Sequence, residues 1–339
     1  MKILVTGGTG YIGSHTVVEL QKEGFEVVIV DNLSNSQAWI ADAIADISGK
    51  KPHFEQFDLA DQKLTADFFR RHSDLMGVIH FAAFKAVGES VDNPLMYYRN
   101  NLVSLMNILE GMQQNVIPNL VFSSSCTVYG QPDELPVSEK APIKKAESPY
   151  GNTKQISEEI IQDTIKSSEI HATALRYFNP IGAHESASIG ELPLGVPNNL
   201  VPFITQTAIG LRKQLSVFGE DYNTPDGTAI RDYIHVVDLA QAHVVAIKRM
   251  INQQMKQRFE IFNLGTGNGY SVLEVIQSFE KVSGLKLNYK IVGRRPGDVE
   301  QVWANPEWSN NELGWKAKRN LDEMTASAWK WEQYYRNKQ

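Results

Sequence analysis

The sequence predicts an α/β fold of the Rossmann type, a doubly wound parallel sheet joined to a smaller α/β C-terminal substrate domain. In the first half of the chain, short apolar runs alternate with amphipathic helical stretches, as in parallel sheets covered on both faces. A glycine-rich segment from Gly7 to Gly13 lies between the first strand and the first helix, where dinucleotide-binding turns are found. The chain of 339 residues exceeds the usual size of one core, so we expect two domains.

The first half reads as six strands alternating with five helices, bounded by turn residues. The expected strands are 2–6, 26–31, 53–57, 77–81, 120–124 and 171–177. The expected helices are 12–23, 36–47, 64–71, 94–114 and 149–166. Ligands of such sheets bind beyond the carboxyl ends of the strands. Five polar or glycine-rich segments follow strands in this way, so we expect the functional site at that edge.

The second half changes character after Pro180, because proline, glycine and asparagine become frequent through 182–199 and indicate loops. The first domain is therefore expected to span 1–180, with about 230–265 returning to it, and the smaller domain to span 181–339. The expected elements of the second half are a helix near 201–211, a strand at 215–218, a regular segment at 233–249, a strand at 260–264, a helix near 271–282, a strand near 287–291 and a C-terminal helix around 321–335.

The glycine segment and a later acid predict an NAD site. Glycine allows the tight turn and the close approach of the backbone to a pyrophosphate, which then lies at a helix N-terminus. Asp31 ends the second strand at about the spacing of a ribose-binding carboxylate. Such an acid accepts hydrogen bonds from the ribose hydroxyls and repels a 2′-phosphate, so NAD is favoured over NADP.

Composition limits the class of protein. The net charge of −6 gives no basic surface for nucleic acid, and no apolar run approaches the length of a membrane span. Cys126 is the only cysteine, which excludes an internal disulfide. The first residues read as a core strand and not as a signal peptide. We therefore expect a cytoplasmic enzyme without nucleic-acid or membrane partners.

A candidate catalytic set follows the fifth strand. Tyr150 and Lys154 are four residues apart and so share one face of a helix, and Ser125 lies upstream at a strand end. A phenol with an ordinary pKa near 10 is a poor base at neutral pH. A neighbouring ammonium is expected to lower that pKa, and the serine hydroxyl would hold the substrate oxygen whose proton is removed.

Over essentially its whole length the chain resembles the extended short-chain dehydrogenase/reductase family, and within it the UDP-hexose 4-epimerases. The glycine turn and the Tyr150–Lys154 pair mark the wide family, whereas other segments point to the epimerases. The matching segments are TGGTGYIGSH (6–15), VDNLSNS (30–36), HFAAFKAVGES (80–90), FSSSCTVYG (122–130), LRYFNPIGAH (175–184), NNLVP (198–202), VFGEDYNTPDGTAIRDYIHVVDLAQAH (217–243), 263–267 and RRPGD (294–298).

The resemblance implies a role for each matching residue. Ser125, Tyr150 and Lys154 would be catalytic. The NAD-binding residues would be Gly7, Gly10, Tyr11, Ile12, Gly13, Asp31, Asn32, Asp58, Leu59, Phe81, Ala82, Lys85, Asn100, Ser125, Tyr150, Lys154 and Phe178. The residues that bind the UDP-sugar would be Asn179, Asn199, Leu200, Arg231, Tyr233, Arg295 and Asp298. Arginine at two of these positions also suits an anionic diphosphate.

The resemblance also implies the activity. It is the reversible epimerisation at C4 of a UDP-hexose, UDP-galactose to UDP-glucose, in galactose metabolism. A hydride would pass transiently to tightly bound NAD, through a 4-keto intermediate that turns within the site. The family further implies a homodimer, for which the helices 94–114 and 149–166 are the candidates.

Three alternatives remain at this point. A sugar-nucleotide 4,6-dehydratase needs an acid and a base directly after the catalytic hydroxyl residue, where this chain has Cys126 and Thr127. An NADP reductase is disfavoured by Asp31. A non-catalytic dinucleotide sensor could keep the glycines but has no need of the catalytic set.

Two further expectations concern substrate range and metals. The resemblance implies that the size of residue 302 limits the space around the bound sugar. Val302 is of intermediate size, so N-acetylated UDP-hexosamines stay possible substrates. No two histidines show the sequence spacing of a metal site, so no metal is expected. His80 and His235 are expected to be hydrogen-bonded structural residues.

Overall fold

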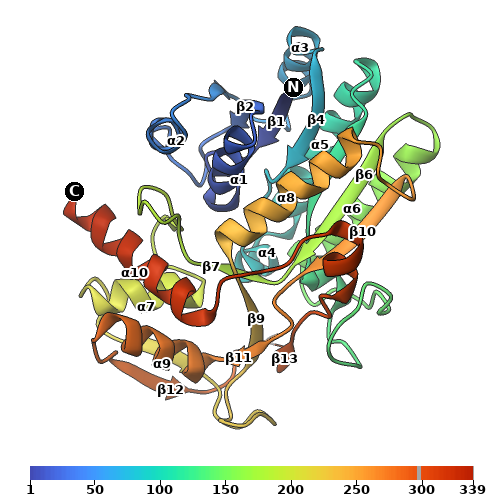
Figure 1. Cartoon of the computed structure of the whole chain (residues 1–339). Coiled ribbons are helices and arrows are strands. Elements are labelled where there is room, and N and C mark those ends of the chain that lie inside the picture. Colours follow the sequence, from blue (N-terminus) through green and yellow to red (C-terminus); the bar gives the residue numbers. More distant parts are fainter. Residues whose placement is uncertain (296–298, 339) are drawn as a thin grey trace.

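The computed structural model describes residues 1–295 and 299–338 and contains a large sheet covered by helices on both faces (Figure 1). The sheet has seven strands in the order β10-β6-β5-β4-β1-β2-β3, and every neighbouring pair is parallel. The strands are β1 (Lys2–Thr6), β2 (Glu26–Asp31), β3 (His53–Gln56), β4 (Leu75–His80), β5 (Asn119–Ser125), β6 (His171–Tyr177) and β10 (Phe259–Leu264). The predicted Rossmann-type parallel sheet is confirmed.

Each face of the sheet packs on its own set of helices, because successive side chains of a strand point to opposite faces. Ile3 and Val5 of β1 belong to the apolar core beneath one set, whereas Leu4 belongs to the core beneath the other. The first set is α1 (Tyr11–Lys22), α2 (Ile40–Ser48) and α8 (Val236–Ile251), and the second is α3 (Gln62–Arg71), α5 (Pro94–Gln114) and α6 (Pro149–Lys166).

Capping residues explain where the helices begin. Ser148 accepts a hydrogen bond from the Gly151 amide at 3.1 Å, and proline occupies the first position of α6. The predicted bounds of α5 and α6 are confirmed. Helix α2 begins later than predicted, because the Ser36 hydroxyl donates to the Asp31 carboxylate at 3.1 Å and holds this segment as a loop.

Apart from α8 and β10, which belong to the large sheet and its helices, the second half of the chain forms a smaller α/β layer beyond the carboxyl ends of the large sheet (Figure 1). In one of its sheets β9 lies between β11 and β13 and also pairs with β7, and in the other β12 pairs with β8. The strands are β7 (Asn179–Ile181), β8 (Leu215–Phe218), β9 (Ile230–His235), β11 (Gly269–Ser271), β12 (Tyr289–Val292) and β13 (Gln301–Val302). The helices are α7 (Leu200–Ala208), α9 (Val272–Ser283) and α10 (Leu321–Asn337).

Several short elements were not predicted. They are α4 (Val87–Asp92), the 3₁₀ turn η1 (Cys126–Tyr129), the π-helical turn η2 (Ser309–Leu313) and the strands β7, β11 and β13. Each is too short to show a periodic apolar pattern, so only pairing or packing defines it. Among the described residues there is no helix with the length and apolar character that crossing a membrane requires.

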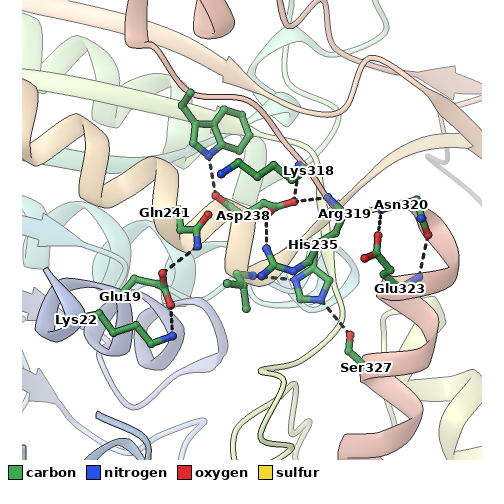
Figure 2. A network of polar contacts seen from close by, with 12 residues as sticks. Glu19, Lys22, His235, Asp238, Gln241, Lys318, Arg319, Asn320, Glu323 and Ser327 are labelled. Atoms are coloured by element: carbon green, nitrogen blue, oxygen red, sulfur yellow. Dashed lines mark hydrogen bonds and ion pairs between the residues drawn. The ribbon is translucent and has the colours of Figure 1, made fainter. Parts of the chain in front are cut away.

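A buried polar network joins α8 to the chain segment that precedes α10 (Figure 2). The fully buried Asp238 carboxylate accepts from the Lys318 and Arg319 amides, each at 2.9 Å, and pairs with the Arg319 guanidinium. His235 Nε2 lies 3.1 Å from the Ser327 hydroxyl, and its Nδ1 accepts from the Val237 amide. His235 is therefore the hydrogen-bonded structural residue that was predicted.

Candidate active site

The glycine turn after β1 leaves room only for hydrogen atoms. Gly7 has a φ of +66°, and a Cβ added there would lie 2.9 Å from the Ala82 amide nitrogen. A Cβ on Gly13 would lie 2.2 Å from the Gly7 carbonyl oxygen. Helix α1 follows at once, with Gly10 as its N-cap, no side-chain cap and no acid in the first turn. Its N-terminal amides thus suit an anion such as a pyrophosphate, so the residues present fit a dinucleotide.

The end of β2 is tied to this turn through Asp31. Its carboxylate accepts from the Leu33 amide at 2.9 Å and from the Thr9 amide at 3.2 Å. The Asn32 amide nitrogen lies 3.4 Å from an Asp58 carboxylate oxygen, which brings together two predicted adenosine-side residues from neighbouring strands. Leu59 is buried beside them.

The loop after β4 lies close to the glycine turn. The Phe81 and Ala82 amides donate to the Thr6 carbonyl and hydroxyl oxygens at 3.2 and 3.3 Å. Lys85 places its Nζ 6.0 Å from the Tyr11 ring centroid and 3.5 Å from the Glu191 carboxylate. This brings β4, α1 and the loop before α7 together at one place.

Two polar residues at this edge, Asn101 and Glu191, were not predicted. Asn101 accepts from the Asn100 side chain at 2.9 Å and joins the β4 loop to α6, through the Phe84 amide and the Thr153 hydroxyl. Glu191 accepts from both Lys85 and Asn199. Neither residue carries a sequence pattern, because its partners come from distant parts of the chain.

The three predicted catalytic residues lie together at the carboxyl end of β5 and the start of α6. Ser125 ends β5, and Tyr150 lies in the first turn of α6 with Lys154 one turn later. The Lys154 Nζ lies 5.9 Å from the Tyr150 ring centroid and donates to the Ser123 carbonyl oxygen at 2.6 Å. All three side chains are buried, Tyr150 with 8% exposure.

Burial dominates the electrostatics of this group. It raises the pKa of the Tyr150 phenol, with the neighbouring Tyr177 adding to the rise and hydrogen bonding to Ser125 opposing it. It also lowers the pKa of Lys154 to about 8, against the opposing charge of Glu158. The expectation that Lys154 lowers the pKa of Tyr150 thus differs from the structure, in which desolvation of the phenol is the larger effect.

A buried polar network behind Lys154 was not predicted. Glu158, one turn after Lys154, pairs with the Arg176 guanidinium and accepts from the Ser124 hydroxyl. Arg176 also donates to the Tyr129 hydroxyl at 3.0 Å, which donates to Asn263. An arginine inside an apolar strand was the one signal that could have revealed it, since such a charge requires a partner.

Five of the predicted sugar-side residues lie on β7, β9 and the start of α7, and Arg295 follows β12. Asn179 pairs in register with Tyr233, and Arg231 pairs with Val302 of β13. Asn199 is the N-cap of α7, which begins at Leu200. The exposed Arg295 places its guanidinium 5.9 Å from the Phe218 ring centroid. Asp298 lies outside the described residues.

Phe178 and Val302 belong to one buried apolar cluster. The cluster also contains Val128, Val137 and Ala304, so it joins the end of β6 to the turn after β5 and to β13. Cys126 packs against it, and burial raises the pKa of its thiol to about 12. The thiol is therefore a packing group at neutral pH.

Comparison with known proteins gives one consistent picture. A family model described as GDP-mannose 4,6 dehydratase matches residues 4–328. The UDP-glucose 4-epimerase of Bacillus subtilis (strain 168) is 50% identical over 333 residues, which is 98% of this chain and 97% of that protein. The relatives thus share nearly the full length of the chain.

Solved structures agree with this. The UDP-glucose 4-epimerase of Stenotrophomonas maltophila, with bound NAD and formylated UDP-arabinopyranose, is 46% identical with a TM-score of 0.96 and covers 100% of both chains. The UDP-Glc/GlcNAc 4-epimerase of Campylobacter jejuni is 36% identical with a TM-score of 0.84, covering 98% of this chain and 99% of that one.

Proposed function

Because the chain belongs to the UDP-glucose 4-epimerase family, we propose that it interconverts UDP-galactose and UDP-glucose by inverting C4 of the hexose. The observation that carries this is the buried group of Ser125, Tyr150 and Lys154 at the sheet edge that also holds the glycine turn. The matching dehydratase model describes the wider fold family. Cys126 and Thr127 provide neither the acid nor the base that dehydration requires, so epimerisation is the better supported reaction.

The protein's own residues would bind the substrate and move one proton. NAD, when held by the glycine turn and the residues around it, would supply a reversible hydride acceptor for C4 of the hexose. Tyr150 would take the proton of the C4 hydroxyl and give it back, with Ser125 holding the same oxygen. Lys154, fixed by the Ser123 carbonyl, would hold positive charge near the phenol oxygen. The burial of all three residues keeps water from this proton.

We assign the cofactor and substrate contacts on the same basis. The glycine turn and the first turn of α1 would bind the pyrophosphate, Asp31 and Asn32 the adenosine ribose, and Asp58 and Leu59 the adenine. Phe81, Ala82, Lys85, Asn100 and Phe178 would line the rest of the NAD groove. The UDP-sugar would contact Asn179, Asn199, Leu200, Arg231, Tyr233 and Arg295, with Asp298 as a further candidate outside the described residues.

The test is incubation of the purified protein with UDP-galactose and no added reductant. We expect UDP-glucose to accumulate to an equilibrium mixture that is reached from either sugar, without net formation of NADH. A dehydrated keto-sugar product would identify a dehydratase instead. Substrate that stays unchanged with NAD bound would identify a dinucleotide sensor. A parallel incubation with added NADPH tests the reductase, which would consume NADPH during turnover.

A second substrate class, the N-acetylated UDP-hexosamines, is favoured by one observation. Val302 is a medium-sized residue at 7% exposure in the apolar cluster that contains Phe178, and it is paired in register with Arg231. The similar Campylobacter jejuni protein is described as a Glc/GlcNAc epimerase. Replacement by tyrosine (Val302→Tyr) should reduce turnover of UDP-N-acetylgalactosamine far more than that of UDP-galactose. Inactivity of the wild-type protein on the acetylated sugar would exclude this class.

We also propose a homodimer built on α5 and α6, which pack against each other. Val91 at the end of α4, Leu95 at the start of α5 and Met106 further along α5 leave apolar side chains 59%, 74% and 40% exposed. Light scattering should give twice the chain mass of 38.0 kDa, and Leu95→Arg should lower it. A role in galactose metabolism and a cytoplasmic location stay predictions.

A further inference from the structure

A group of two histidines and one glutamate lies on the edge strand of the large sheet. His53 and Glu55 are two residues apart on β3, so their side chains share one face of that strand. Helix α3 follows β3 in the chain and ends at Arg71, and His72 directly after it reaches the same carboxylate. The sequence did not reveal this group, because the fold and not a short spacing brings the histidines together.

The two imidazoles converge on one oxygen atom. The Glu55 Oε1 atom lies 3.3 Å from the His53 Nε2 and 2.7 Å from the His72 Nε2. All three potential ligand atoms lie within 4.8 Å of one another. Bonds of about 2.0–2.1 Å in a tetrahedral zinc site place neighbouring ligand atoms about 3.3 Å apart. The His53–Glu55 pair already has this separation. The His72–Glu55 pair would have to widen from 2.7 Å, and the two imidazole nitrogens, which lie within 4.8 Å of each other, would have to reach about 3.3 Å.

We propose that His53, Glu55 and His72 form a binding site for a divalent cation of the zinc class, with water as the fourth ligand. Two imidazoles and a carboxylate suit zinc, and a water-filled fourth position is common where three protein groups bind it. The side chain of His53 is 57% exposed, so a cation can enter from solvent. None of the three residues belongs to the candidate active site, so the ion would take no part in the proposed epimerisation.

The surroundings orient the carboxylate but also limit the affinity. Arg71 pairs with the second oxygen of Glu55, as partners behind a metal ligand often do. The same guanidinium adds positive charge close to the cation. We therefore expect binding at micromolar rather than nanomolar zinc. A bound ion would fasten β3 to the end of α3, next to the strand end that leads into Asp58 and Leu59.

The zinc content of the protein tests the proposed site directly. Protein without a histidine tag is stripped with a chelator, dialysed against Zn²⁺ and analysed for metal, with the melting temperature recorded in parallel. We expect one zinc ion per chain and a melting temperature that rises with zinc. His53→Gln and His72→Gln should each weaken binding by about tenfold or more. His171→Gln, at a partly exposed strand histidine, is the matched control and should change nothing.

Two results would overturn the site: wild-type protein that retains no zinc after dialysis, and zinc binding that is equal in His53→Gln and in the control. Either would mean that the group is only a hydrogen-bonded cluster around Glu55. Because His53 is exposed, its replacement should leave the fold intact, which circular dichroism would verify. Because the experiment measures metal content, a negative result would not bear on the proposed epimerase activity.

Discussion

Glu158 and Arg176 form a buried ion pair one helical turn behind Lys154. Both side chains are less than a tenth exposed, and Arg176 contacts both carboxylate oxygens, with its Nε 2.9 Å from Oε1. Glu158 also raises the pKa of Lys154, against the larger effect of burial. The pair thus joins β6 to α6 and also affects the pKa of Lys154, a candidate catalytic residue.

We expect Glu158→Gln to destabilise the protein by about 3–5 kcal/mol, because the Arg176 charge would stay buried without its counterion. The pKa of Lys154 should fall further in the same variant. Denaturant unfolding measures the first effect. The neighbouring exposed Glu159→Gln is the control and should stay within about 0.5 kcal/mol of wild type. Equal stabilities of the two variants would contradict the prediction.

Lys154 predicts a pH-dependent stability difference. Its pKa of about 8 lies below the ordinary value of 10.5, so between these pH values the unfolded chain holds a proton that the folded chain has lost. The free energy of unfolding therefore rises with pH between about 8 and 10.5 because of Lys154. Below pH 8 the folded protein keeps the buried Lys154 charge, which is unfavourable. Lys154→Met removes the effect. Its stability relative to wild type should fall by about 3 kcal/mol between pH 7 and 10.5 in urea unfolding. A pH-independent difference would refute this.

Tyr150→Phe removes only the phenolic oxygen from a buried ring. We expect kcat to drop by about 10²–10⁴-fold or more, because the proton of the C4 hydroxyl loses its acceptor. NAD binding should persist, since the glycine turn is untouched, and fluorescence or retained NAD after gel filtration would show it. Near-normal turnover would remove Tyr150 from the mechanism.

Gly13→Ala tests the glycine turn. The new Cβ would lie 2.2 Å from the Gly7 carbonyl oxygen, which is backbone and cannot rotate away. We expect a destabilisation of about 1–3 kcal/mol and a loss of bound NAD. Gly88→Ala is the matched control, because nothing lies within 4 Å of its added Cβ and it is also helical. If Gly13→Ala kept its NAD, the close approach of helix and turn would not be needed for binding.

The sequence predicted the elements whose ends carry local signals. The bounds of β1, β2, β6, α5 and α6 agree with the prediction. Glycine follows β1, an acid ends β2, and proline begins both α5 and α6. The three-residue strands β7 and β11 exist only through pairing with β9, which no local pattern encodes. The Glu158–Arg176 pair depends in the same way on two segments that meet only after folding.

The position of β10 at one edge of the large sheet also affects the order of events during synthesis. Its partner β6 ends at Tyr177, but β10 ends at Leu264, 87 residues later (264 − 177). At about 5–20 residues per second, a nascent chain therefore waits about 4–17 s with the outer edge of β6 open. An open strand edge is a template for wrong pairing. Chains stalled or cut within this interval should be the ones that chaperones retain or that aggregate.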